Sequence, residues 1–270
     1  MPVVPLYRSL LAGGWQEVAR RYPEYPAALE ETYGPEPFGP WGVWDPDHPA
    51  IPAALAQIRR CAGAGWEDRA AALLRAAHRH LPGPPPVCYL GTLLGLGPAA
   101  TLSRSGEPVI AVGLERFDPA ARPGPPPRSL YHPGELEEML PHEAAHSARF
   151  RALGLPPTPR LLSLADMLLL EGTALLFTDW LLGRETLPSF LPVPDLVRVV
   201  AAGPLLLRAI QPELGERGMS IFTRYFGTGA PISGYALGLA LVRRYQEATG
   251  EDPVAILLTP TDRILAVALT

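Results

Sequence analysis

The 270-residue chain is long enough to bury a sizeable core, and 47% of its residues are apolar while 19% are charged. Its 34 prolines and 26 glycines indicate many rigid loops, but the apolar content is too high for a disordered chain. A formal net charge of −4 excludes a protein that binds nucleic acid through a broad basic surface. We therefore expect a globular protein without a nucleic-acid partner.

The cysteines and the N-terminal sequence indicate the compartment. Cys61 and Cys88 are too few for a disulfide scaffold or a cysteine-based zinc site, and two buried thiols are favoured over one bridge. The N-terminal sequence MPVVPLYRSLLAGGW lacks the cationic start and long apolar run of a signal peptide. Carboxylates interrupt the most apolar stretch, 161–182, so it falls short of the about 18–20 apolar residues of a membrane span. These features predict a cytoplasmic protein without stable membrane association.

Residues 1–85 are predicted to form a helical N-terminal subdomain. Residues 53–65 and 67–81 are rich in Ala and Leu, and their apolar positions recur with helical periodicity. The sequence 34–52 that precedes them is rich in Pro and Gly and predicts a loop.

A small antiparallel sheet is predicted next. Short apolar or β-branched segments typical of strands lie at residues 87–94, 99–103 and 109–114. The sequence SGE at 105–107 predicts the turn between the last two strands. Two proline-rich spacers, LPGPPP before the strands and RPGPPP after them, are expected to be stiff connectors.

From Gly134 onward the chain is predicted to be helical. Six segments show helical periodicity: 134–153, 162–182, 194–211, 215–226, 232–248 and a last one that begins at Thr261. The sequence therefore predicts an α+β fold that is mostly α-helical. We expect residues 1–270 to form a single domain, in which residues 86–270 combine the sheet with a helical region.

The sequence HEAAH at 142–146 is an HExxH motif. Because His142 and His146 are four residues apart, they lie on the same helix face, and both imidazoles can reach one metal ion. Glu143 lies about 100° around the helix from His142, which suits a general base rather than a ligand. A zinc ion lowers the pKa of its water to about 7, and a neighbouring carboxylate can take the proton as a carbonyl is attacked. A solvent-facing helix that carries two histidines is the alternative interpretation.

Pro141 directly precedes the motif, and a proline inside a helix removes a backbone hydrogen bond and usually kinks the helix. Either the helix from Gly134 bends there, or a new helix begins with Pro141 in its first turn. Both alternatives place His142 and His146 on one face. Glu138 is expected to be a solvated surface acid rather than a carboxylate that supports a ligand.

Glu171 is the candidate third ligand. It is the only charge on its face of the predicted helix 162–182, whose other faces are also largely apolar. A lone buried carboxylate costs several kcal/mol unless it meets a cation or a metal. The sequence GLPPTPR allows this helix to pack antiparallel to the motif helix, with Glu171 facing the histidines. An ion pair with Arg149 or Arg151 is the alternative.

The sequence PHEAAHSARF followed by LADMLLLEGTALLF resembles the gluzincin pattern, in which HExxH and a Glu on a later helix hold zinc. With SGYALGL at 233–239 and the strand sequence SRSGEPVIAVGLERF, these motifs are similar to a bacterial family of predicted Zn-dependent proteases. The resemblance implies a zincin-like fold and one zinc ion per chain. It implies that the ligands are His142, His146 and Glu171, and that Glu143 is the base. Tyr235 is implied to stabilise the oxyanion or to orient substrate, and a core tyrosine with a satisfied hydroxyl is the alternative.

Several other side chains give weaker signals. Asp166 and Asp179 are candidates for carboxylates that orient the ligand histidines, and His132 is a candidate to enter the site from a loop. The remaining histidines are expected to be solvated: His48, His78 and His80.

These observations predict a zinc-dependent peptide-bond hydrolase that acts on peptides or proteins. The substrate is expected to lie extended beside residues 109–114 and to add to the sheet edge. Two alternatives are a structural or regulatory helical protein, in which zinc only staples two helices, and a peripheral membrane protein that uses the Leu-rich helix. The Glu143→Gln variant separates the first alternative from a hydrolase, because a structural site is indifferent to it.

Overall fold

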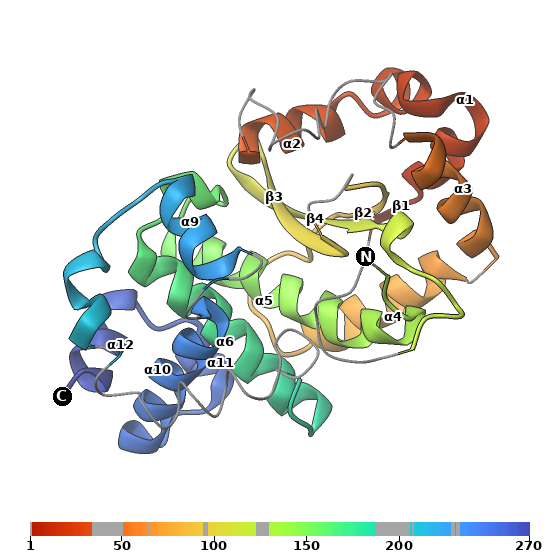
Figure 1. Ribbon diagram of the computed structural model, residues 1–270. Coiled ribbons are helices and arrows are strands. Elements are labelled where there is room, and N and C mark those ends of the chain that lie inside the picture. Colours follow the sequence, from red (N-terminus) through yellow and green to blue (C-terminus); the bar gives the residue numbers. More distant parts are fainter. Residues whose placement is uncertain are drawn as a thin grey trace. The chain divides into compact units, whose positions relative to one another are not determined.

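The computed structural model describes residues 2–33, 51–63, 65–93, 97–122, 130–186, 206, 208–227, 230 and 233–270 (Figure 1). Contacts divide the chain into two compact units. The sheet unit comprises Met1–Pro123 and Arg128–Ser147, and the helical unit comprises Gly124–Pro127 and Ala148–Thr270. The boundary falls within helix α5, Leu136–Leu153, which carries the HExxH motif.

The sheet unit contains a four-stranded mixed sheet with the order β1-β2-β4-β3. Its strands are β1 Val3–Val4, β2 Cys88–Gly91, β3 Ala99–Arg104 and β4 Glu107–Gly113. Only β3 and β4 are antiparallel, while β2 pairs in parallel with both β1 and β4. The turn predicted at 105–107 is confirmed, because Ser105 and Gly106 both have positive φ, at 52° and 80°, as a two-residue hairpin requires.

The prediction of an antiparallel sheet was therefore wrong in part. After β2, the chain places β3 on the far side of β4, so the consecutive strands β2 and β3 are not neighbours. The two-residue strand β1 is too short to give a periodic signal. As a result β4 is a central strand with a partner on each side, and the expectation that a substrate adds beside it was also wrong.

Among its described residues, the sheet unit wholly contains the α-helices α1 Leu6–Arg21, α2 Glu24–Tyr33, α3 Ile51–Cys61 and α4 Trp66–His78. Helix α2 lies along β3 (Figure 1). Its Thr32 Oγ1 accepts a hydrogen bond of 2.7 Å from the Ser103 N–H. The Glu31 carboxylate accepts the N–H groups of Ser105 and Gly106 at 2.7 and 2.9 Å. Helix α2 therefore fixes one end of β3 and the hairpin turn.

The cysteines of this unit are free and buried, as the sequence predicts. Burial raises the pKa of both thiols, that of Cys88 to about 12. Both side chains therefore remain protonated at neutral pH, as inert core groups.

Helix α5 runs without interruption through Pro141, so no new helix begins there. It is preceded by the short 3₁₀ helix η2, Pro133–Glu135. His132 caps η2, because its Nδ1 accepts the Gly134 N–H at 2.9 Å while Glu135 accepts the His132 N–H at 2.7 Å.

The helical unit consists of η3 Pro159–Leu161, α6 Leu164–Leu182, η4 Gln211–Glu213, α9 Met219–Phe226, α10 Gly234–Thr249, α11 Pro253–Leu257 and α12 Thr261–Ala268 among its described residues. The segments predicted at 134–153, 162–182, 232–248 and from Thr261 are thus confirmed as helices, with small shifts of their ends. Most of the predicted helix 194–211 lies outside the described residues.

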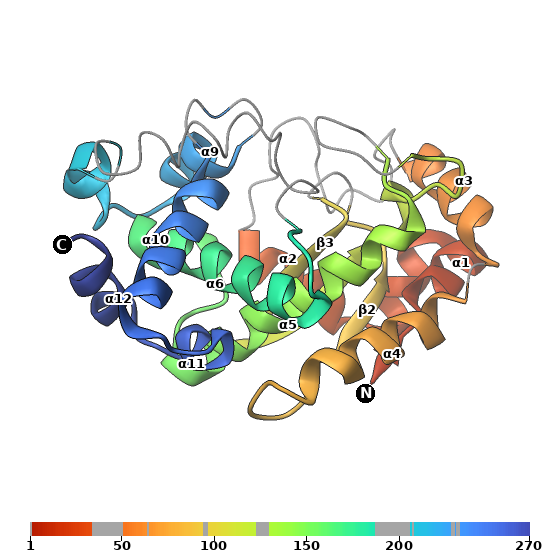
Figure 2. The ribbon, with the colours of Figure 1, turned by 90° about the horizontal axis from the view of Figure 1, so that it is seen from below.

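Helix α6 forms the centre of this unit. Its residues from Leu164 to Thr178 are buried apart from Asp166 and Glu171, which are partly buried. Helix α10 packs beside α6, and α11 and α12 also contact α6 (Figure 2). None of the helices within the described ranges is both long and apolar enough to cross a membrane.

Candidate metal centre

The two motif histidines lie side by side on α5. His142 and His146 are only 2% and 5% exposed, and their ring centroids are 4.4 Å apart. The interpretation of the motif as a solvent-facing helix was therefore wrong. Two imidazoles buried at this spacing can both bind one metal ion.

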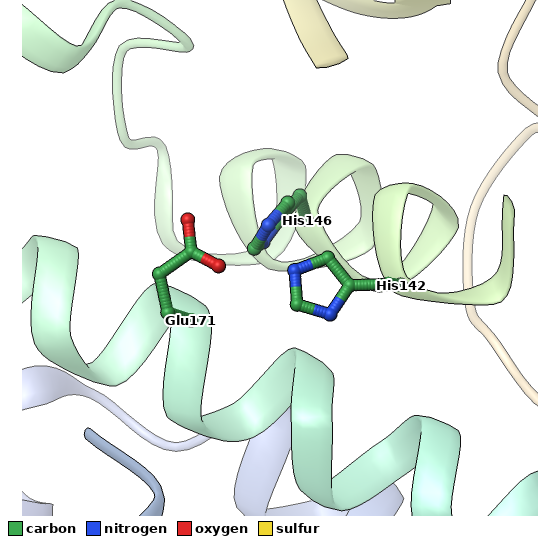
Figure 3. Close-up of side chains that lie close together, drawn as sticks. All are labelled: His142, His146 and Glu171. Carbon is green, nitrogen blue, oxygen red and sulfur yellow. The ribbon is translucent and has the colours of Figure 1, made fainter. Parts of the chain in front are cut away.

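The structure brings Glu171 of α6 to this pair. One nitrogen from each histidine and one carboxylate oxygen of Glu171 all lie within 4.8 Å of one another (Figure 3). Two imidazoles and one carboxylate are a donor set that zinc accepts, and three protein ligands are typical of a catalytic zinc site. These three residues could therefore hold a metal ion.

Two glycines determine how closely α6 and α10 approach next to Glu171. A Cβ atom on Gly172 would lie 2.3 Å from the Gly238 carbonyl oxygen, and one on Gly238 would lie 2.0 Å from the Leu168 carbonyl oxygen. The helix backbones are thus in direct contact at the residue that follows Glu171. This contact explains Gly172 in the sequence LADMLLLEGTALLF and Gly238 in the sequence SGYALGL in physical terms.

Arg149 does not pair with Glu171, although the sequence allowed that alternative. Its buried guanidinium donates to the Leu257 and Thr259 carbonyls at 2.7 and 3.0 Å. Burial lowers the pKa of Arg149 to about 10, and the negative charge of Asp166 acts in the opposite direction. Arg149 therefore binds the turn that follows α11 within the helical unit.

Glu143, the residue between the ligand candidates, is 9% exposed and faces the sheet. The Thr101 hydroxyl on β3 donates to Glu143 Oε2 at 2.7 Å. Burial, and to a lesser extent the charge of Glu143, raises the pKa of Tyr33 at the end of α2 above its usual value. Neither Thr101 nor Tyr33 could be singled out from the sequence, because neither belongs to a motif and both are distant from Glu143 along the chain.

Tyr235 lies in the first turn of α10 and is partly buried. Its ring packs edge-on against Phe226, with centroids 5.4 Å apart and an interplanar angle of 83°. A Cβ on the preceding Gly234 would lie 2.4 Å from the Phe226 ring, so this glycine makes room for the aromatic pair. The packing explains the position of Tyr235, and its catalytic role stays a prediction.

Glu138 was predicted to be solvated, but it is only 3% exposed. The reason is that α5 is buried on nearly all sides from Glu138 to Phe150, so a residue one turn before His142 has no access to solvent.

The other carboxylates make structural hydrogen bonds instead of orienting histidines. Asp166 accepts from the Ser163 and Thr261 hydroxyls at 2.6 and 2.8 Å. Asp179 accepts from the N–H and hydroxyl of Thr186. His132 caps η2, as described above. Of the remaining histidines, His80 is exposed, His78 is partly buried, and His48 lies outside the described residues.

Residues 127–266 match the family described as "Predicted Zn-dependent protease (DUF2268)". The match covers slightly more than half of the chain, so the chain belongs to this family. No curated protein and no solved structure matches the chain. The matched residues include the three ligand candidates, Glu143 and Tyr235, whereas Tyr33 and Thr101 precede them.

Proposed function

We propose that the protein is a zinc-dependent peptide-bond hydrolase of the gluzincin type, with one zinc ion held by His142, His146 and Glu171. The observation that carries this proposal is the convergence of three ligand atoms within 4.8 Å, from an HExxH helix and a later helix. The family's description as a Zn-dependent protease supports the same metal and the same reaction. Zinc in such a site polarises the scissile carbonyl and makes water acidic enough to be deprotonated near neutral pH.

Glu143 is the proposed general base. Glu143 directly follows the first ligand, and the Thr101 hydroxyl on β3 donates a hydrogen bond to one of its carboxylate oxygens. It takes a proton from the attacking water and returns it to the leaving amine, so the residue ends the cycle ionised. Tyr235 is the proposed residue that stabilises the oxyanion or orients substrate.

The substrate is proposed to be a peptide that extends along the outer edge of β3, the last strand in the described part of the sheet. Ile110, opposite Thr101, donates its N–H to Val87 on the other side of β4. Thr101 and Ile110 therefore form a non-hydrogen-bonded pair of the antiparallel ladder. In such a pair the N–H and C=O of Thr101 point away from β4, toward the outer edge. The N–H of Ser103 also points outward, but it donates to Thr32. The part of the edge that can pair with a peptide is therefore Ala99–Thr101.

A peptide library digested by the purified protein tests this function. The zinc-loaded protein is expected to cleave internal peptide bonds, and mass spectrometry of the products identifies them. Removal of the metal with a chelator should abolish cleavage, and addition of zinc should restore it. Cleavage that survives complete metal removal, or no cleavage by protein carrying its zinc, would contradict the proposal.

A further inference from the structure

The hydroxyl of Thr101 is the one hydrogen-bond donor to the Glu143 carboxylate among the described residues. Its Oγ1 lies 2.7 Å from Glu143 Oε2 and 3.2 Å from the Glu143 backbone oxygen. A hydroxyl carries one proton, and the shorter contact to a carboxylate is the stronger, charge-assisted bond. Glu143 Oε1 accepts no hydrogen bond from the part of the chain that the structure describes.

We propose that Thr101 is a positioning residue that holds the general base, a role that rests on the function proposed above. With Oε2 bound to Thr101, rotation of the Glu143 carboxylate is restricted, and Oε1 is the oxygen left for proton transfer. Because proton transfer requires heavy atoms within about 2.6–3.2 Å, a carboxylate that turns freely spends less time in a productive position.

The support of Thr101 is rigid. A threonine on a strand has few side-chain rotamers, because its Cβ is branched. Its strand pairs with β4 over six residue pairs, from Ala99 to Arg104, and α2 binds the Ser103 N–H on the other side. The hydroxyl therefore approaches Glu143 from a strand that is held by β4 along its length and by α2 at Ser103.

Thr101 also belongs to the strand edge proposed for the substrate. Its side chain binds Glu143, while its backbone N–H and C=O face outward and no loop or side chain within the described ranges bonds to them. A peptide that pairs with this edge would be bound next to the residue that holds the base. The position of the scissile bond and the position of the carboxylate are thereby fixed by one residue.

The isosteric variant Thr101→Val tests the role, with Thr101→Ser as the variant that keeps the hydroxyl. On the best peptide from the library, we expect Thr101→Val to lower kcat about 10–100-fold, with KM and zinc content close to those of the wild type. Thr101→Ser should recover most of the loss. Thr178→Val is the matched control, since among the described residues this buried hydroxyl bonds to the Ala174 carbonyl of its own helix and to no other group.

A double-mutant cycle on the zinc-loaded full chain measures the contact without any assay of activity. We expect Thr101→Val to shift the urea midpoint less in a Glu143→Ala background than in the wild type. If the urea-midpoint shifts of Thr101→Val and Glu143→Ala simply add in the double variant, the hydrogen bond between these two side chains would be contradicted. An unchanged kcat in Thr101→Val, with coupling present, would overturn the positioning role. A wild-type protein that binds zinc but cleaves nothing would overturn the proposed function and with it the catalytic use of Thr101, while the cycle would still report the hydrogen bond.

Discussion

Glu143→Gln is expected to lower kcat by a factor of about 10³ while the protein still binds one zinc ion. Glutamine has nearly the same shape as glutamate but cannot take a proton from water at neutral pH. Because Glu143 is not among the three ligand candidates, the donor set for the metal stays intact. Steady-state kinetics on a library-derived peptide give kcat, and elemental analysis of the same sample gives the zinc content.

This variant also separates the hydrolase from a protein in which zinc only joins two helices. A structural site needs His142, His146 and Glu171 but does not depend on a base. Turnover by Glu143→Gln equal to that of the wild type would show that Glu143 is not the base. Loss of zinc from this variant would show instead that the carboxylate belongs to the metal site.

Gly238→Ala is expected to lower the free energy of unfolding by about 2–4 kcal/mol. The new Cβ would lie 2.0 Å from the Leu168 carbonyl oxygen and 3.1 Å from the Gly172 nitrogen. These are backbone atoms that cannot rotate away, so α10 and α6 must separate. The better helix propensity of alanine, about 1 kcal/mol, offsets only part of this cost. Since Glu171 precedes Gly172 on α6, the displaced helix should also bind zinc more weakly.

The measurement is urea unfolding of zinc-loaded protein, together with a zinc titration. Gly215→Ala is the matched control in the same unit, because a Cβ there meets nothing within 4 Å and the residue is exposed. It should change stability by less than about 0.5 kcal/mol. If Gly238→Ala were as stable as Gly215→Ala, the close helix contact would be wrong.

The ligand candidates could be predicted from sequence because helical spacing is local. The four-residue separation of His142 and His146 and the solitary charge of Glu171 on an apolar helix both follow from a period of 3.6 residues. The ends of α6 also follow from local signals, with Ser163 and Asp166 forming a capping box at its start and Gly183 at its end.

The surroundings of Glu143 could not be predicted, because they depend on which strands are neighbours. Periodicity identified residues 99–103 as a strand but not as the edge strand that lies against α5. The Thr101–Glu143 hydrogen bond is itself non-local, because 42 positions separate the two residues in the sequence. The burial of Glu138 was also missed: α5 is buried at every position from Glu138 to Phe150, so its sequence lacks the polar face of a surface helix.

The zinc content of the purified, zinc-loaded protein tests the central claim most directly. Elemental mass spectrometry is expected to find about one zinc per chain in the wild type and almost none in His146→Ala or Glu171→Ala. The variant His80→Ala, which removes an exposed histidine, should keep its zinc. A wild-type chain that stays free of zinc, or a His146→Ala variant that holds as much zinc as the wild type, would contradict the assignment of the metal centre.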